Sequence, residues 1–194
     1  MLVVGICGSP RSKSTEHILL EALHILENKG IKTKFWTVRK KRIGFCTHCD
    51  YCPKDEICIY KDDMHELYAL LKEAKGIIFA SPVYNGGISA QTKTVMDRCR
   101  AVVFSEKNFF KHKICMGIAA GGDRMGGQEN ALMQIHTFYI LNGMIPVSGG
   151  FLGSNLGSTF WTNDTLDGAK QDEEGFRTLN KTVKRFAEFL NKYE

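Results

Sequence analysis

The sequence predicts an α/β protein of three layers, in which a doubly wound, five-stranded parallel sheet lies between two layers of helices. Short apolar runs alternate with helical patterns along all 194 residues, as they do in chains built from strand–helix–strand units. The runs are continuously apolar, as in residues 77–80, which suits strands that are covered on both faces. No linker, repeat or low-complexity stretch divides the chain, so we expect a single domain over residues 1–194.

The expected strands and helices alternate along the chain. The predicted strands are residues 2–7, 32–38, 76–80, 113–119 and 144–148. The predicted helices are residues 15–29, 64–74, 89–100, 127–141 and 173–192. Gly30 and Gly143 follow the first and fourth helices as terminating glycines, and Asp63 with Glu66 forms a capping-box pattern at the second. Because crossovers between parallel strands are right-handed, the helices should cover both faces of the sheet.

The composition is that of a soluble globular protein. Hydrophobic residues make up 43% and charged residues 24% of the chain, and the net charge of +5 is mild, so no nucleic-acid partner is expected. No basic segment precedes the first strand, and polar residues and glycines break the uncharged stretch 131–163, so no membrane segment is expected. Without an export signal, seven cysteines indicate the reducing cytoplasm, where clustered cysteines are metal ligands or redox groups.

The fourth predicted helix is apolar in nearly every direction. Its apolar side chains are Ala131, Leu132, Met133, Ile135, Phe138, Tyr139, Ile140 and Leu141. A helix that is apolar all round is normally covered all round. We therefore expect a second subunit over it, in a homo-oligomer such as a dimer or tetramer. A helix sunk deeply into its own domain is the alternative.

The turn after the first strand, residues 8–15, has the composition of a phosphate site. A helix begins there, and a helix N-terminus offers unpaired N–H groups and the positive end of a dipole. Ser9, Ser14 and Thr15 add hydroxyl donors and Arg11 adds a guanidinium. The turn lacks the glycine spacing of dinucleotide folds and the lysine of Walker loops, so a terminal monophosphate is the anion that it suits. Plain helix capping is the alternative.

Two further loops follow strands at the same edge of the predicted sheet. Residues 80–87 combine a stiffening Pro82, an aromatic Tyr84 and an amide at Asn85 with a pair of glycines. Residues 120–127 contain four glycines, which let a backbone approach a ligand closely. Each loop alone fits a simple connector. Together with the phosphate turn, they predict a site for a planar heterocycle that carries a phosphate.

Four cysteines lie within thirteen residues, at Cys46, Cys49, Cys52 and Cys58. Three cysteines at successive two-residue spacings, as at Cys46, Cys49 and Cys52, hold cubane iron–sulfur clusters in bacterial ferredoxins, and Cys58 after five residues completes four ligands. Structural zinc sites usually pair two Cys-x-x-Cys knuckles across a longer stretch. Zinc with help from His48 or His65, and reactive or disulfide-bonded cysteines, are the alternatives. The cluster-binding segment is expected at residues 43–60, as an insertion after the second strand.

The remaining cysteines, Cys7, Cys99 and Cys115, lie in apolar or helical contexts and are expected to be buried and structural.

Several of these motifs resemble the NADPH-dependent FMN reductase family, a group of flavodoxin-like proteins, over most of the chain. The matching residues are Gly8-Ser9-Pro10-Arg11, Ser14-Thr15, Ser81-Pro82-Val83-Tyr84, Lys93 and Asp97-Arg98. The resemblance implies that Ser9, Arg11, Ser14 and Thr15 bind the phosphate of FMN. It implies that the isoalloxazine is contacted by Pro82, Val83, Tyr84, Asn85, Gly86, Gly121, Gly122 and Asp123.

The cysteine motif, in its position after the second strand, is similar to that of the iron–sulfur flavoproteins of archaea and anaerobic bacteria. That resemblance implies a [4Fe-4S] cluster on the four cysteines beside FMN, in an oligomer in which one subunit's cluster can serve another's flavin. It also implies electron transfer between a one-electron carrier such as ferredoxin and a two-electron acceptor. No acid–base catalytic set is present, and this chemistry requires none.

Two other functions fit the sequence. One is an NAD(P)H-dependent FMN or quinone reductase with a structural zinc site, and the other is a non-enzymatic electron carrier. The basic run Arg39-Lys40-Lys41-Arg42 lies just before the cysteines. It is a candidate for steering an acidic electron carrier, although it also suits a solvated loop or compensation of the cluster's negative charge.

Overall fold

The protein is built around a seven-stranded sheet whose order along the main path is β2-β1-β3-β5-β6. The computed structural model describes residues 1–193. The parallel strands of this path are β1 (Leu2–Cys7), β2 (Lys32–Thr37), β3 (Gly76–Tyr84), β5 (Ile114–Gly121) and β6 (Ile145–Pro146). The predicted α/β class, the parallel pairing and the doubly wound arrangement are therefore confirmed.

The predicted strand number of five is wrong, because two further strands join the sheet. β7 (Ser158–Trp161) pairs in parallel with the carboxyl half of β5, whereas β6 pairs with its first two residues. The expected fifth strand, residues 144–148, is thus shortened to β6, and β7 is a strand that the sequence analysis did not predict. Pro146 and the glycines at 149, 150 and 153 keep β6 short, since proline donates no ladder hydrogen bond and glycine weakens a strand.

The second additional strand, β4 (Gly87–Ile88), pairs antiparallel with the end of β3. Asn85 and Gly86 connect the two strands and have positive φ angles of 49° and 80°. An Asn-Gly pair in this conformation is the favoured two-residue hairpin turn. The Asn-Gly signal was present in the sequence, but the pattern of apolar residues ended the third strand at residue 80. The predicted loop 80–87 is therefore largely a hairpin.

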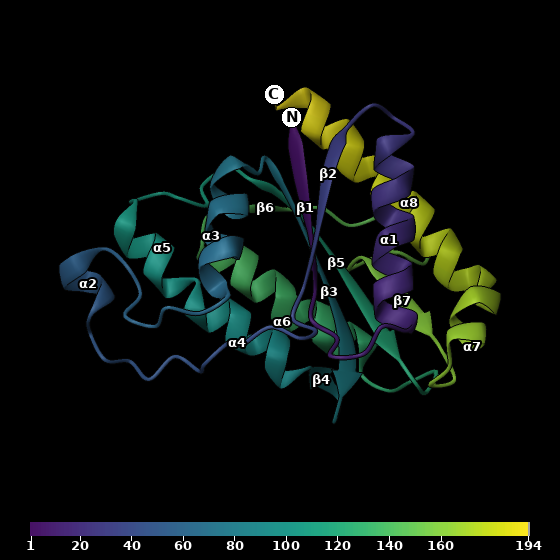
Figure 1. The fold of residues 1–194 in the computed structure, drawn as a ribbon. Coiled ribbons are helices and arrows are strands. Elements are labelled where there is room, and N and C mark those ends of the chain that lie inside the picture. The colour runs from purple at the N-terminus through teal and green to yellow at the C-terminus, as the bar shows by residue number, and fades with distance from the viewer. Residues whose placement is uncertain (194) are drawn as a thin grey trace.

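Helices cover both faces of the sheet (Figure 1). On one face lie α1 (Ser14–Glu27), α7 (Leu166–Gln171) and α8 (Glu173–Lys192). On the other lie α3 (Met64–Glu73), α4 (Ala90–Arg98), α5 (Arg100–Ser105) and α6 (Gln128–Leu141). Each face has its own apolar core, one around Leu19, Ile118 and Val183 and the other around Leu67, Phe79 and Ile135.

Two helix ends differ from the sequence expectation. The predicted capping box of Asp63 and Glu66 is wrong, because the side chain of Asp63 accepts a hydrogen bond from the N–H of Arg42 instead. Glu66 pairs with Lys41. The predicted helix 89–100 ends at Arg98, and α5 begins at Arg100 as a separate helix.

The face of α6 that points away from the sheet is partly apolar. Met133, Ile140 and Leu141 are exposed, whereas Leu132, Ile135 and other apolar residues of the helix are buried. Among residues 1–193, no helix is both long enough and apolar enough to cross a membrane.

The segment between β2 and α3 leaves the body of the protein at the edge where β2 ends (Figure 1). It contains one short helix, α2 (Cys52–Asp55), and is otherwise irregular. All four clustered cysteines lie on this segment, and we call its residues 44–62 the cysteine segment.

Candidate functional site

The turn between β1 and α1 forms one wall of a small cavity at the carboxyl edge of the sheet. The cavity has a volume of about 30 Å³. Eight of the predicted cofactor residues line it, namely Ser9, Arg11, Ser14, Thr15, Pro82, Val83, Tyr84 and Gly122. The parallel strands bring these distant segments together, because β1, β3 and β5 end at the same edge.

The N-terminus of α1 faces this cavity without a side-chain cap. Lys13 occupies the cap position and makes no capping hydrogen bond, so the plain-capping alternative does not explain the hydroxyl residues. Ser9 and Thr15 are buried, and the Ser9 hydroxyl donates to the carbonyl of Arg11 at 3.1 Å. The Ser14 hydroxyl donates to the carbonyl of Thr165 at 2.8 Å. Hydroxyls, a guanidinium and first-turn N–H groups are thus gathered at the positive end of a helix.

Arg11 is held by an acidic residue that the sequence did not indicate. Its Nη2 lies 2.7 Å from Oδ1 of Asp164, and the hydrogen bond from Arg11 lowers the pKa of that carboxyl. Asp164 and Thr162 follow β7 and line the cavity with Lys13 and Ala120. No sequence pattern marked these residues, because they reach the site only through the pairing of β7 with β5.

A buried hydroxyl network fixes the turn from beneath. The Ser89 hydroxyl donates to the carbonyl of Gly8 at 2.8 Å. The Thr92 hydroxyl donates to the hydroxyl oxygen of Ser81 at 2.9 Å. Ser81, Ser89 and Thr92 are fully buried. Gly8 fits against this network so closely that an added Cβ would lie 1.8 Å from Oγ1 of Thr92. Hydrogen bonds therefore join the end of β1, the end of β3 and the start of α4. We call the residues that line the cavity, together with this network, the cradle.

Four of the predicted cofactor residues lie outside the cavity lining. Asn85 and Gly86 form the hairpin turn, where the Gly86 carbonyl accepts a hydrogen bond from Asn130 of α6. The carbonyl of Gly121 accepts from Thr162, and that of Asp123 accepts from Gln128.

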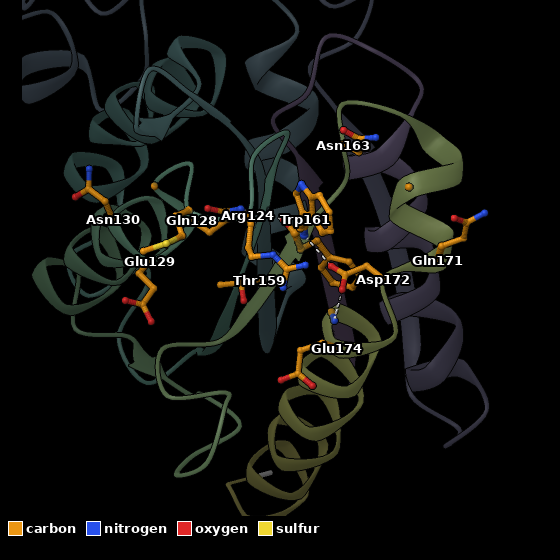
Figure 2. A pocket seen from close by; sticks show the side chains of 15 residues that line it. Arg124, Gln128, Glu129, Asn130, Thr159, Trp161, Asn163, Gln171, Asp172 and Glu174 are labelled. Carbon is orange, nitrogen blue, oxygen red and sulfur yellow. Dashed lines mark hydrogen bonds between the residues drawn. The ribbon is translucent and has the colours of Figure 1, made fainter.

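A second and much larger cavity has a volume of about 870 Å³, and Asn163 of its lining lies in sequence between Thr162 and Asp164 of the cradle. Figure 2 shows Arg124 and Trp161 side by side within it, with Glu129 on the α6 side and Asp172 and Glu174 on the α8 side. The guanidinium carbon of Arg124 lies 4.5 Å from the centre of the indole ring, a stacked cation–π contact. The cavity offers an aromatic surface with charges of both signs around it.

The four clustered cysteines line one cavity at the surface of the protein, with a volume of about 20 Å³. Cys46 and Cys49 are exposed, Cys58 is half-buried and Cys52 is buried. Ile59, Tyr60, Arg98 and Arg100 complete much of the lining. Among residues 1–193, no three His, Cys, Asp or Glu side chains are spaced to hold a single metal ion. His48 and His65, the predicted alternative ligands, do not line this cavity.

Two arginines from the α4–α5 junction reach the cysteines. Nη2 of Arg98 donates to Sγ of Cys58 at 3.2 Å, and Nη1 of Arg100 donates to Sγ of Cys52 at 3.4 Å. Burial raises the pKa of the Cys52 thiol, and the Arg100 guanidinium opposes that rise. The positive charges are placed where deprotonated sulfur ligands would need compensation. The sequence pattern showed Arg98 only as part of a family motif and gave no reason to connect it with the cysteines.

The other three cysteines are buried in the core as predicted. Burial raises the pKa of Cys7 to about 11 and that of Cys99 to about 12. Thiols that are protonated and enclosed in this way are poor nucleophiles and poor ligands.

Comparison with known proteins supports the fold and shows the family. The chain matches the family described as NADPH-dependent FMN reductase over residues 1–158. An iron–sulfur flavoprotein of Archaeoglobus fulgidus is 64% identical over 193 residues, which cover 100% of this chain and 99% of that protein. Another, from Methanocaldococcus jannaschii, is 50% identical over 98% of this chain and 97% of its own. A flavodoxin, WrbA-like protein from Agrobacterium tumefaciens shares the fold with a TM-score of 0.68 at 17% identity, over 100% of this chain and 98% of that one.

The parallel sheet and the cradle at its carboxyl edge define the class of a flavodoxin-like redox flavoprotein. The chain belongs to the NADPH-dependent FMN reductase family and, within it, groups with the iron–sulfur flavoproteins. Both family resemblances predicted from the sequence motifs are therefore confirmed.

Proposed function

We propose that this protein carries FMN and a [4Fe-4S] cluster and transfers electrons between a one-electron carrier such as ferredoxin and a two-electron partner. The observation that carries the proposal is the cysteine cavity, in which four thiols from residues 46–58 meet two guanidinium groups at the surface. The same chain presents the cradle with its uncapped helix N-terminus. When bound, the cluster supplies one-electron chemistry, and the flavin exchanges electrons singly or in pairs.

The donor set of the cradle fits the phosphate of FMN. Ser9, Arg11, Ser14 and Thr15 line the cavity together with the first turn of α1. Each charge-assisted hydrogen bond contributes about 1.5–3 kcal/mol, so three or four would hold a monophosphate firmly. In binding, Arg11 would exchange its contact with Asp164 for the phosphate. Pro82 to Tyr84 of β3 and Gly122 lie beside the phosphate donors, where they would contact the ring. Asn85, Gly86, Gly121 and Asp123 remain predicted ring contacts from the flanking turns.

The donor set of the cysteine segment fits an iron–sulfur cluster. Cys46, Cys49, Cys52 and Cys58 would supply four thiolates. Arg98 and Arg100 donate hydrogen bonds to two of the sulfurs, and hydrogen bonds to cluster sulfurs are one means by which a protein sets the reduction potential. The cavity opens at Cys46 and Cys49, so a docked carrier would approach the cluster from that side.

The surface around the cysteines suits a docking partner. Phe45, Ile57 and Ile59 are exposed apolar side chains of the cysteine segment, and grouped exposed apolar residues often mark interaction sites. In the basic run, Arg39 pairs with Glu16 and Lys41 with Glu66, whereas Lys40 and Arg42 are exposed. We propose that these exposed cations steer an acidic carrier.

The second, larger cavity is the proposed place of the two-electron partner. Its volume of about 870 Å³ is enough for a nicotinamide or quinone substrate. The same cavity favours the second candidate function, an NAD(P)H-dependent FMN or quinone reductase whose cysteines hold zinc.

We also propose a cytoplasmic homo-oligomer, since Met133, Ile140 and Leu141 leave part of α6 apolar and exposed.

The test is the content of iron, acid-labile sulfide, zinc and flavin in protein purified without oxygen. About four irons, four sulfides and one FMN per chain would support the two-centre function. Zinc and FMN without sulfide would support the simple reductase and contradict the cluster. Turnover of NADPH by iron-free protein distinguishes the reductase further.

The Cys58→Ala variant tests the ligand assignment. The matched control is Cys99→Ala, which removes a buried thiol that does not line the cysteine cavity. We expect Cys58→Ala to lose the intact cluster and Cys99→Ala to keep it, because four thiolates hold a cubane cluster. An intact cluster with unchanged absorption spectra in Cys58→Ala would show that Cys58 is not the fourth ligand.

A further inference from the structure

Arg98 is a buried charge at the base of the cysteine cavity. Its side chain is 1% exposed. Nη1 and Nη2 lie 2.6 and 2.9 Å from the two carboxylate oxygens of Asp62, in a bidentate ion pair. Nη1 also donates to the carbonyl of Gly44 at 2.7 Å, and Nη2 donates to Sγ of Cys58 at 3.2 Å. The guanidinium carbon lies 5.1 Å from the centre of the Tyr60 ring.

These contacts join the two ends of the cysteine segment. Gly44 lies two residues before the first cysteine, and Asp62 lies four residues after the last. Oδ2 of Asp62 accepts a hydrogen bond from the N–H of Gly44 at 3.0 Å, so Asp62 and Arg98 both bind residue 44. The ion pair therefore closes the loop that contains all four cysteines, and it does so from side chains that lie outside the cysteine motif.

The anchor of this closure is rigid. Arg98 is the last residue of α4, and its backbone carbonyl accepts a hydrogen bond from the hydroxyl of Tyr68 in α3 at 2.8 Å. Asp62 is positioned in turn because its Oδ1 accepts from the N–H of Met64 at the start of α3. Hydrogen bonds to α3 thus fix both Arg98 and Asp62, and with them the ends of the segment.

Burial of this arginine requires a compensating role. Removing a guanidinium from water is costly, and a well-packed apolar side chain would serve the fold at least as well. Nε of Arg98 is buried with no hydrogen-bond partner among the described residues. Of the other two N–H groups that the ion pair leaves free, one donates to the carbonyl of Gly44 and one is directed at the sulfur of Cys58.

We propose that Arg98 is the positioning residue of the cluster site: with Asp62 it closes the cysteine segment, holds Cys58 toward the cavity, and hydrogen-bonds to its sulfur. This inference rests on the proposed function. A hydrogen bond from a cation to a ligand sulfur stabilises the more negative, reduced state of a cluster and so raises its reduction potential.

Arg100 is the natural comparison. It also donates to a cysteine sulfur, on Cys52, and it pairs with Asp50 at 3.0 Å. Its side chain is 25% exposed, and both of its partners lie inside the cysteine segment. Solvent screens such a contact, and it closes no loop end. Arg100→Gln is therefore the matched control, since it removes a cation from the same cavity without opening the segment.

The experiment compares Arg98→Gln, Arg98→Lys, Asp62→Asn and the double variant Asp62→Asn/Arg98→Gln with Arg100→Gln and the wild type. The first readout is trypsin cleavage at Lys54 and Lys61 in protein stripped of metal with a chelator. We expect cleavage to be at least about tenfold faster in each Arg98 and Asp62 variant, because one broken buried ion pair shifts local opening by more than a decade. Arg100→Gln should cleave at the wild-type rate.

The second readout is the midpoint potential of the cluster, measured on protein as purified without oxygen. The potential should shift to more negative values in Arg98→Gln and in the double variant, and by less in Arg100→Gln. The double variant removes both buried charges, so its melting temperature should return toward that of the wild type while its potential stays low. If Arg98 only supported the fold, the melting temperature and the midpoint potential of the double variant would both return toward the wild-type values. Arg98→Lys keeps the charge but not the fork, and should keep more of the potential than of the protection from trypsin.

Wild-type cleavage rates and an unchanged potential in Arg98→Gln and Asp62→Asn would overturn the proposal. A wild-type protein without iron and sulfide would instead overturn the proposed function. In that case the trypsin comparison still decides whether the pair closes the segment, so the two failures are distinguishable.

Discussion

The cradle and the cysteine segment are stabilised in different ways. At the cradle, Gly8 donates to the carbonyl of Ala80 and packs against Thr92, so backbone ladder and buried hydroxyls hold the turn from the inside. The cysteine segment has one four-residue helix, and its ends are held by Asp62 and Arg98. A site formed at the ends of strands takes its geometry from the sheet, whereas a site on an irregular segment depends on individual side chains.

Backbone conformation differs between the two regions in the same sense. In the cysteine segment His48, Asp50 and Glu56 have positive φ angles of 52°, 55° and 58°. Residues other than glycine adopt this conformation at a cost of about 1 kcal/mol each, less for Asp and Asn. Around the cradle, positive φ angles fall on Asn85, Gly86, Asn163 and Asp164, all of them Gly, Asn or Asp residues, which tolerate this conformation best. The cysteine segment therefore stores strain that its external contacts must offset.

The largest expected effect is that of Gly8→Ala, which would break the cradle and leave the cysteine segment intact. The new Cβ would lie 1.8 Å from Oγ1 and 3.3 Å from Cα of Thr92, so the turn must move. Overpacking of this kind costs about 1–3 kcal/mol of stability, and we expect FMN affinity to fall by at least about tenfold, measured by fluorescence titration. Iron content should not change.

Gly44→Ala is the matched control for that variant. Its Cβ would meet Asp62 Oδ2 at 3.9 Å, which is ordinary contact, so both cofactors should bind as in the wild type. Equal loss of iron and flavin in Gly8→Ala would show that the two regions are coupled, contrary to the comparison drawn above.

Asp164→Asn should sharpen the description of the cradle by strengthening FMN binding. The variant releases Arg11, and an exposed ion pair is worth about 0.2–1 kcal/mol, so affinity should rise by up to about fivefold. Because Arg11 lowers the pKa of Asp164, the carboxylate stays charged at neutral pH. The difference in FMN affinity between Asp164→Asn and the wild type should therefore vanish only in acid, as the pH falls through the lowered pKa of Asp164.

Asp167→Asn, three residues further on and also exposed, is the control for this measurement. Weaker FMN binding in Asp164→Asn would indicate that the carboxylate orients Arg11 for the phosphate, and would reject the competition described here.

The smallest effect is expected from Glu56→Gly, which relieves one strained position in the cysteine segment. Glu56 is exposed and follows α2 with a φ of 58°. Glycine adopts this conformation without steric cost, although it gains entropy when unfolded, so the iron-free protein should gain up to about 1 kcal/mol in urea denaturation. Lys54→Gly, inside α2, should instead destabilise it. A loss of stability in Glu56→Gly would argue against stored strain at this site.

The sequence by itself determined the fold class, because continuous apolar strands alternating with helices leave few arrangements other than a parallel sheet with helices on both faces. It also indicated the cradle residues Ser9, Arg11, Ser14 and Thr15, since their spacing after β1 places them at a helix start. The four cysteines were equally visible, because their chemistry depends on residue type and local spacing.

Only the tertiary structure decided which distant residues support these motifs. Asp164 reaches Arg11 because β7 pairs with β5, and Arg98 reaches Cys58 from the end of α4, where the hydroxyl of Tyr68 in α3 binds its backbone carbonyl. The shortening of the fifth strand to β6, the pairing of β7 and the Ser81–Ser89–Thr92 network likewise follow from pairing and packing. These contacts join residues between 8 and 153 positions apart, and the periodicity of apolar residues carries no information about which side chains meet over such separations.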